Sequence, residues 1–365
     1  MFVTAITFLA ILTVLVLIHE AGHFFVAKLI GVNVEEFGMG LPPQIFGKKI
    51  GSTVYSLNWL PIGGFVKLSG EDAEDGTSAK LKNVKQYFFA RSKKERAAIL
   101  CAGVFMNFFL AVVITMFLLT TGIQEPSGRV HLEKVVSGSP AAEAKLAVND
   151  VIVKVWTQDN VGRSSDPRPI RVSADLINFA KLHAGEQVYM AVERDGELLP
   201  TISIIPRKNP PAGQGAIGVA ISDLEIHKYS WTEAPKKALV INLTRARDML
   251  ASLGSTVWRL VTLRSPEADV AGPIGIAQVT GQAVKFGWRA VLEFASILSL
   301  NLAVLNVLPI PALDGGRLAF VIFEKILGRR VRPAFEKSTH QVGMIVLLAL
   351  IFLVSINDIL RLIRG

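Results

Sequence analysis

Four stretches of the chain are almost wholly apolar, and each is long enough for a helix to cross a bilayer, which takes about 20 residues. They cover residues 2–30, 97–121, 290–308 and 342–356, and the last continues to residue 360 across two polar positions. The third stretch carries Glu293, Asn301 and Asn306. This pattern predicts four transmembrane helices.

The composition agrees with a membrane protein. Hydrophobic residues make up 51% of the 365 residues, and the formal net charge is +9. Nucleic acid binding could explain such a charge, but no basic-aromatic motif supports it, and basic cytoplasmic loops give the same excess. The single cysteine, Cys101, excludes a disulfide framework or a cysteine-based metal site within one chain.

Lysine and arginine are concentrated in two of the connecting segments, between the first and second spans and between the third and fourth. Under the positive-inside rule both segments should be cytoplasmic. The N-terminus and the long segment between the second and third spans should then lie outside.

A short β-structure is predicted in the first cytoplasmic segment. Residues 53–60 and 64–68 read as strands joined by a turn at residues 61–63, which favours a β-hairpin. The hairpin could lie on the cytoplasmic surface, or its edge could dip toward a membrane site and pair with an extended substrate. In the second case the candidate substrate-binding residues are Tyr55, Leu57, Trp59, Gly64 and Phe65.

The long outside segment predicts an inserted soluble domain followed by helices. Apolar runs at 151–155 and 188–194, with turns and one or two short helices between them, indicate a mixed domain over residues 123–225. From 226 to 288 an apolar helical stripe is interrupted by basic residues and is too charged to span. We predict amphipathic helices there, lying on the membrane or packed outside it.

A metal-binding pattern lies in the second half of the first span. His19 and His23 are four residues apart and share one face of a helix, with Glu20 beside them. At about 1.5 Å per residue His19 lies roughly 25 Å deep, near the cytoplasmic side. The third span also runs inward and leads to Asp314 at a similar depth, so Asp314 is placed to complete a metal site.

Each candidate residue also has a purely structural interpretation. Asp314 could cap a helix that begins at Gly315, and Asn306 could hydrogen-bond between helices. The remaining histidines, which are expected to be ordinary surface residues, are His131, His183, His227 and His340.

Several motifs occur together along almost the whole chain. They are H-E-x-G-H at 19–23, G-F-V-K-L at 64–68, G-P-I-G at 272–275 and N-x-x-P-x-P-x-L-D-G at 306–315. In this order they resemble the bacterial site-2 proteases, the RseP-type intramembrane zinc metalloproteases. Many such proteases carry two PDZ domains, whereas the outside segment here has room for one.

The resemblance implies a multi-pass α-helical membrane protein with four transmembrane helices, a membrane-associated β-hairpin and an inserted α+β PDZ domain. The domains would be 1–122 with the first two spans, 123–225 as the PDZ domain, 226–288 as membrane-surface helices and 289–365 with the last two spans. It further implies a Zn²⁺ cofactor held by His19, His23 and Asp314, with Glu20 as general base and Asn306 as a substrate-positioning residue.

The implied function is cleavage of transmembrane segments of single-span proteins, such as an anti-sigma factor or remnant signal peptides, in a bacterial inner membrane. The A-G-L-x-x-G-D pattern of PDZ domains appears here as A-K-L-A-V-N-D at 144–150, and no carboxylate-binding glycine loop is recognisable. Peptide binding and a steric filter both stay open for this domain. A metal transporter and a catalytically silent membrane adaptor are the alternative functions, and nothing indicates an oligomeric state.

Overall fold

The computed structural model describes residues 2–71, 83–158, 164–262 and 272–364. The chain forms two compact units, one from Met1–Thr120 with Ser230–Gly365 and one from Thr121–Tyr229. The first unit contains the long apolar helices and a small sheet, and the second contains a larger sheet.

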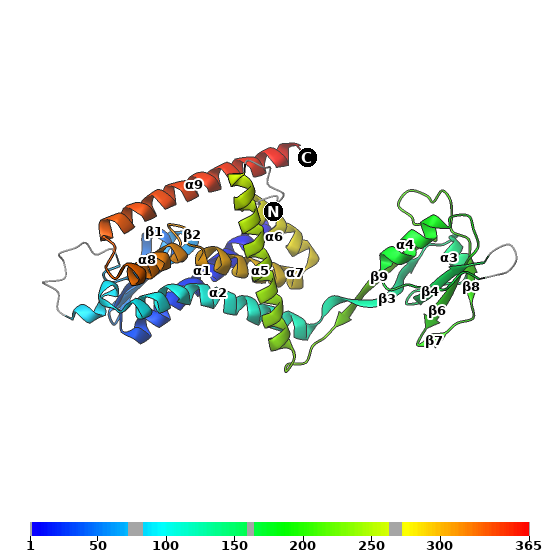
Figure 1. Ribbon diagram of the computed structural model, residues 1–365, viewed down its shortest axis with the longest axis horizontal. Coiled ribbons are helices and arrows are strands. Elements are labelled where there is room, and N and C mark those ends of the chain that lie inside the picture. Colours follow the sequence, from blue (N-terminus) through cyan, green and yellow to red (C-terminus); the bar gives the residue numbers. More distant parts are fainter. Residues whose placement is uncertain (1, 72–82, 159–163, 263–271, 365) are drawn as a thin grey trace. The chain divides into compact units, whose positions relative to one another are not determined.

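Among the described residues of the first unit, four helices are long and apolar enough to span a membrane (Figure 1), which confirms the prediction of a four-span protein. They are α1 (Phe2–Ile30), α2 (Lys93–Thr121), α7 (Trp288–Val307) and α9 (Pro333–Arg364). Many of their large apolar side chains are exposed in the protein itself, such as Phe105, Ile345 and Phe352. Surfaces of this kind fit contact with lipid rather than water.

Helix α2 begins four residues before the predicted span because its first turn is capped by polar side chains. The Glu95 N–H donates to Ser92 Oγ at 3.3 Å, and the Ser92 N–H donates to the Glu95 carboxylate at 2.8 Å. This reciprocal capping box satisfies amides that the start of a helix leaves open. Hydropathy alone cannot detect such a charged first turn.

The segment predicted as amphipathic surface helices forms α5 (Ala234–Val261) and α6 (Pro273–Phe286). α5 runs across α2 and α7 at a steep angle (Figure 1). Its Asn242 is fully buried, and Nδ2 donates to Thr115 Oγ1 of α2 at 3.0 Å. Because this contact is buried, α5 is packed into the helical unit along one face and does not lie free on a surface.

The small sheet consists of β1 (Val34–Ile50) and β2 (Thr53–Leu68), which pair antiparallel. Residues 34–39 of β1 pair on one side with 64–68 and on the other with 54–57, and residues 44–50 pair with 53–58. The predicted pairing of 53–60 with 64–68 is therefore wrong, because the first part of β1 lies between them. Residues 64–68 form one edge of this sheet.

Glycines in β1 allow this close approach. A Cβ at Gly38 would lie 2.4 Å from the Phe65 ring, and one at Gly40 would lie 2.4 Å from the Leu60 carbonyl oxygen. The sequence of β1 mixes glycine, proline and charged residues and shows no alternation of polar and apolar positions. The signal that predicts strands was therefore missing there.

The second unit is an antiparallel sheet with two short helices on it. Its strands and helices are β3 (Ile123–Val135), α3 (Pro140–Glu143), β4 (Val151–Thr157), β5 (Arg168–Pro169), α4 (Ser173–Leu182), β6 (Val188–Arg194), β7 (Glu197–Leu198), β8 (Ile202–Ile204) and β9 (Val219–His227). The order is β7-β6-β4-β3-β9, with β5 beside β4 and β8 beside β6. Buried residues of β3, β4 and β6 build one apolar core with Leu176 and Phe179 of α4.

Three non-glycine residues of this unit have left-handed backbone conformations, Asp195 in the β6–β7 turn and two residues in the turn before β4. Lys145 has φ +57° and Asn149 has φ +70°. They occupy the two positions at which the pattern A-G-L-x-x-G-D has glycine. Glycine adopts this conformation freely, whereas a side chain such as that of lysine costs roughly 1–2 kcal/mol.

Replacing Lys145 by glycine should therefore stabilise the second unit by about 1 kcal/mol, because it removes the Cβ strain at this turn. Hydrogen exchange of the β4 and β6 peptides, measured by mass spectrometry on the whole chain, reports the local free energy of unfolding. The matched control is Lys154→Gly in strand β4, which should lower that free energy by about 0.5–1 kcal/mol. Faster exchange in Lys145→Gly than in wild type would contradict the strain argument.

The turn that contains Lys145 is tied to strand β6 by one buried carboxylate. Asp150 is fully buried and accepts hydrogen bonds from Arg194 Nε at 2.6 Å and from the Ala147 N–H at 2.8 Å. Burial raises the pKa of Asp150, but these hydrogen bonds and the positive charge of Arg194 lower it by more. The folded-state pKa is therefore below the usual value of about 3.9.

A lowered pKa contributes stability that is present above about pH 4 and is lost as the pH falls through the folded-state value. Between about pH 6 and about pH 3, wild type should thus lose more unfolding free energy than Asp150→Asn, whose amide does not titrate. Thermal unfolding of both proteins at the two pH values measures the difference. Equal losses in wild type and variant would show that Asp150 does not stabilise this turn through its charge.

Candidate metal centre

The two histidines of α1 lie one turn apart and face the same point. His19 Nε2 and His23 Nε2 are 3.2 Å apart, and each residue is 8% exposed. The apolar sequence of α1 favours an uninterrupted helix in a membrane, and the spacing of four residues then brings the two rings together. The sequence prediction of a shared face is confirmed.

Asp314 reaches the histidines from the other end of the chain. Its Oδ2 lies 2.9 Å from His19 Nε2 and 3.2 Å from His23 Nε2. Helix α7 ends at Val307, the chain continues through an irregular segment with two prolines, and α8 (Asp314–Leu327) begins at Asp314 itself. The predicted meeting of the first span with the segment after the third is thus observed.

The glycines that follow Asp314 make this approach possible. A Cβ at Gly315 would lie 2.1 Å from the Leu308 carbonyl oxygen, and one at Gly316 would lie 2.3 Å from the Ile310 carbonyl oxygen. Side chains at either position would push the start of α8 away from the preceding segment. The D-G-G sequence therefore provides both a ligand and the space to place it.

The three side chains can hold one metal ion. Ligands about 2.0–2.1 Å from a tetrahedral zinc lie about 3.3–3.4 Å from one another. The separations between the two Nε2 atoms and Oδ2 are 2.9, 3.2 and 3.2 Å. Two imidazoles and one carboxylate are a zinc donor set, and three protein ligands leave a fourth position for water or substrate, as in catalytic sites.

Helix α2 supports both imidazoles. His23 Nδ1 donates to the Ile99 carbonyl oxygen at 2.8 Å, which fixes its ring and leaves Nε2 for the metal. The Asn107 amide lies 3.4 Å from His19 Nδ1 and is fully buried. Oδ1 of Asn107 lacks a partner among the described residues. When the amide is rotated by 180°, Oδ1 faces His19 and accepts a hydrogen bond from its Nδ1–H, which leaves Nε2 of His19 for the metal.

Glycines bring α2 against the site. A Cβ at Gly103 would lie 2.4 Å from His23 Nε2 and 2.6 Å from His19 Cε1, and one at Gly22 of α1 would lie 2.4 Å from the Ala102 carbonyl oxygen. Small residues at helix contacts permit such close packing in membranes. Sequence reasoning missed Gly103, Asn107 and Ile99, because only the contact between helices distinguishes them from other residues of an apolar span.

Glu20 lies between the histidines and the edge of the small sheet. Its carboxylate accepts a hydrogen bond from the Val66 N–H of β2, and its Cγ lies 3.7 Å from where a Cβ of Gly64 would be. It lies within electrostatic range of both histidines and Asp314. A carboxylate here is placed to exchange a proton with a group bound at the metal.

The other predicted substrate-binding residues are spread along β2. The Tyr55 ring lies 6.0 Å from the Phe24 ring, and the Phe65 ring packs on Gly38. Leu57 and Trp59 are exposed. Among these residues Gly64 lies next to the candidate centre, since a Cβ there would be 3.7 Å from Glu20 Cγ.

Asn306 is half-buried in the last turn of α7, eight residues before Asp314. Within the described residues its side chain has no recorded hydrogen bond. Substrate positioning and a contact between helices both stay predictions for Asn306.

His340 is not the ordinary surface histidine that the sequence suggested. It lies in α9 and accepts a hydrogen bond at Nδ1 from the Ala312 N–H at 2.9 Å. Ala312 has φ +79°, a left-handed conformation that needs support in a residue with a side chain. His340 thus holds the irregular segment just before Asp314, a role visible only once α9 folds back against it.

Comparison with known proteins agrees with this geometry. The model of peptidase family M50 matches residues 7–350. The chain is 33% identical over 347 residues to a candidate zinc metalloprotease of Clostridium perfringens, covering 95% of each chain. It is 28% identical to the regulator of sigma-W protease RasP of Bacillus subtilis, and the alignment covers 98% of this chain and 99% of that protein.

Three findings agree. The family model matches most of the chain, relatives match over nearly their full length, and the His-His-Asp cluster suits zinc. The resemblance to site-2 proteases that the motifs indicated is confirmed. This chain is a multi-pass zinc metalloprotease that belongs to peptidase family M50.

Proposed function

We propose that this protease is an intramembrane endopeptidase that cleaves the transmembrane segments of single-span membrane proteins. The observation that carries the proposal is the position of the His19–His23–Asp314 cluster. Its histidines lie in α1, a span with no charged side chain before His19. A peptide bond that reaches this cluster must itself come from within the membrane.

The geometry supports a role for each of the site residues. His19, His23 and Asp314 hold the zinc, which when bound polarises a scissile carbonyl and makes a bound water more acidic. Glu20 accepts the proton of the attacking water and delivers it to the leaving amine. Val66 keeps the Glu20 carboxylate in place through its N–H.

The edge of the small sheet is suited to hold an unwound substrate. A helical segment hides its amides in its own hydrogen bonds, so the scissile region must become extended before attack. Residues 64–68 pair with β1 on one side and lie beside Glu20. An extended substrate can add to their other side as a further strand, while Asn306 holds its backbone or the developing oxyanion.

The basic loops support an orientation in which the unit Thr121–Tyr229 is extracytoplasmic and the metal centre is near the cytoplasmic side of a bacterial inner membrane. We further propose that residues 123–225 are a PDZ-like domain that acts before substrate reaches the membrane site, as a filter or a peptide binder. The Bacillus subtilis relative is named as a regulator of sigma-W protease. We propose regulated proteolysis for this chain too, with an anti-sigma factor or remnant signal peptides as substrates.

Membership of a zinc metalloprotease family favours hydrolysis over the two alternatives. A metal transporter needs polar groups along a path through the bilayer, whereas the recorded ligand cluster lies at one level. A silent adaptor needs no general base, and Glu20 is present and held beside the cluster.

Glu20→Gln should remove proteolysis and keep the metal. General acid–base catalysis contributes typically about 10²–10⁴-fold, so cleavage of a single-span substrate in liposomes should fall by at least about a hundredfold. Zinc content, measured by elemental analysis, should stay at the wild-type level because no ligand is lost. Wild-type cleavage by this variant would remove Glu20 from the mechanism, and cleavage by wild type after zinc removal would refute the metalloprotease proposal.

Gly103→Ala should weaken zinc binding, although residue 103 is not a ligand. The added methyl group would lie 2.4 Å from His23 Nε2, so the imidazoles must move. Disturbing the surroundings of metal ligands typically costs about 10–100-fold in metal affinity, which competition with a chromogenic chelator measures. Gly254→Ala in α5 is the control, since its methyl group would meet no atom within 4 Å; equal affinities in both variants would contradict the steric role of Gly103.

A further inference from the structure

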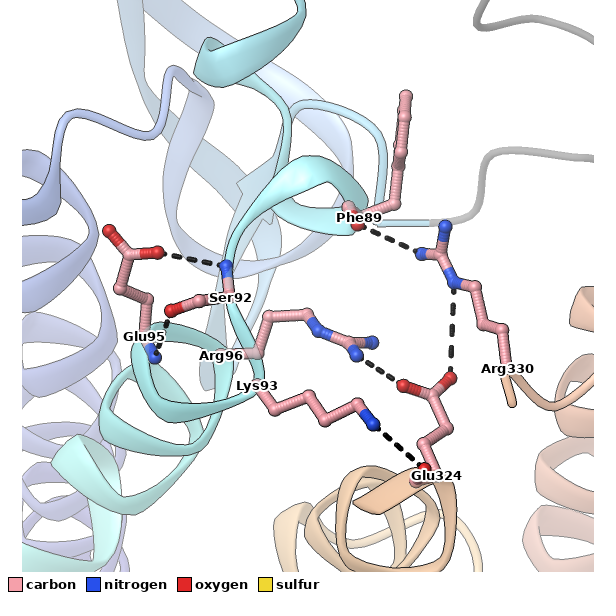
Figure 2. Close-up of polar contacts among 7 residues, drawn as sticks. All are labelled: Phe89, Ser92, Lys93, Glu95, Arg96, Glu324 and Arg330. Carbon is pink, nitrogen blue, oxygen red and sulfur yellow. Dashed lines mark hydrogen bonds and ion pairs between the residues drawn. The ribbon is translucent and has the colours of Figure 1, made fainter. Parts of the chain in front are cut away.

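A buried ion pair joins helix α2 to helix α8, far from each other in the sequence. Arg96 Nη2 donates to the Glu324 carboxylate, and their side chains are only 9% and 2% exposed. Figure 2 shows this pair together with the charged side chains around it. None of these residues belongs to the metal cluster.

Glu324 is held at both its side chain and its backbone. Lys93 Nζ donates to the Glu324 carbonyl oxygen at 2.8 Å, near the C-terminal end of α8. Arg330 Nε lies 3.9 Å from the Glu324 carboxylate, and Arg330 also donates to the Phe89 carbonyl oxygen at 3.1 Å (Figure 2). The end of α8 is thus fastened to the start of α2.

The same stretch of α2 also organises the metal centre. Ile99 accepts the hydrogen bond of His23, Gly103 lies against both imidazoles, and Asn107 lies against His19. Together with Arg96 these residues follow a spacing of three or four, so they lie along one face of the helix. One rigid face therefore positions the histidines and also anchors Glu324.

Helix α8 depends on this anchor for its position along α2. Asp314 is its first residue, and Glu324 follows ten residues later, about 15 Å along the axis. Of its apolar side chains only Val321 is fully buried, with Gly315 and Gly316 the other buried residues besides Glu324. A single buried apolar side chain places little constraint on the position of α8 along α2. Arg317 of α8 pairs with Glu71, which lies outside α2, so the buried Arg96–Glu324 pair is the side-chain ion pair that directs α8 against α2.

The energetics of buried ion pairs favour a role in position. Their desolvation cost is large, and apolar residues of similar volume often stabilise a protein equally well or better. A buried pair does, however, fix which atoms meet, because a displaced charge is left unpaired in a medium of low polarity. Arg96 and Glu324 therefore contribute geometry more than net stability.

We infer that Arg96 and Glu324 are positioning residues that set the register of α8 against α2, so that the Asp314 carboxylate meets His19 and His23. The inference rests on the proposed metal site. Lys93 supports the same register through the backbone of Glu324.

The test is the zinc affinity of the full-length protein in detergent, measured by competition with a chromogenic chelator. Glu324→Asp keeps the charge but shortens the side chain by one methylene, so α8 must shift to keep the pair. Its zinc affinity should fall by about 10–100-fold, as for other losses of support around metal ligands. Thermal unfolding of the zinc-free protein measures the stability of the fold independently of zinc binding. We expect the unfolding temperature of Glu324→Asp to differ from that of wild type by only a few degrees.

A second ion pair between helices provides the matched control. Arg245 Nη2 lies 3.3 Å from the Glu293 carboxylate, joins α5 to α7 and is exposed. Glu293→Asp applies the same shortening to this pair and should leave the zinc affinity within about twofold of wild type. Equal zinc affinity in Glu324→Asp and Glu293→Asp would overturn the inference, whatever their thermal stability.

Two further measurements keep the test decisive. If Glu324→Asp yields no folded protein, Lys93→Met removes only the bond to the Glu324 carbonyl, and it should lower the zinc affinity by at least about threefold; an unchanged affinity would then overturn the inference. If wild type itself binds no zinc, the proposed function fails. If wild type binds zinc and the Glu324 and Lys93 variants bind it equally well, only the positioning role fails.

Discussion

The constraint on which this structure depends is the meeting of one carboxylate with two imidazoles in the apolar part of the protein. Asp314 Oδ2 lies within 3.2 Å of both Nε2 atoms, although its residue comes from the opposite end of the sequence. A carboxylate taken into an apolar environment is costly unless it is paired or binds a metal. The separations suit a single zinc, and the surrounding helices are arranged to maintain them.

Helix α2 carries most of this arrangement without supplying a ligand. Its backbone fixes His23 through Ile99, its side chain Asn107 lies on His19, and Gly103 allows the close approach. Farther along the same face the Arg96–Glu324 pair holds α8. A rigid helix can serve both contacts because residues spaced by three or four keep a fixed geometry.

The small sheet adds the remaining element, a strand edge beside Glu20, the proposed general base. Glycines at 38 and 40 let β1 pass between the two halves of β2, and this leaves residues 64–68 as an outer edge next to Glu20. The observed topology therefore explains how a strand can both hold Glu20 through Val66 and offer hydrogen bonds to an extended chain.

The sequence by itself determined the four spans, the histidine pair and its partner Asp314, because apolar length and helical spacing are local properties that the bilayer enforces. It also indicated the strands at 151–155 and 188–194, from their apolar runs. Only the tertiary structure decided the pairing of β1 with both halves of β2, the roles of Gly103, Asn107 and His340, and the link between Arg96 and Glu324. These depend on contacts between segments distant in sequence, and a glycine, an asparagine or an arginine shows no local signal of the neighbour it will meet.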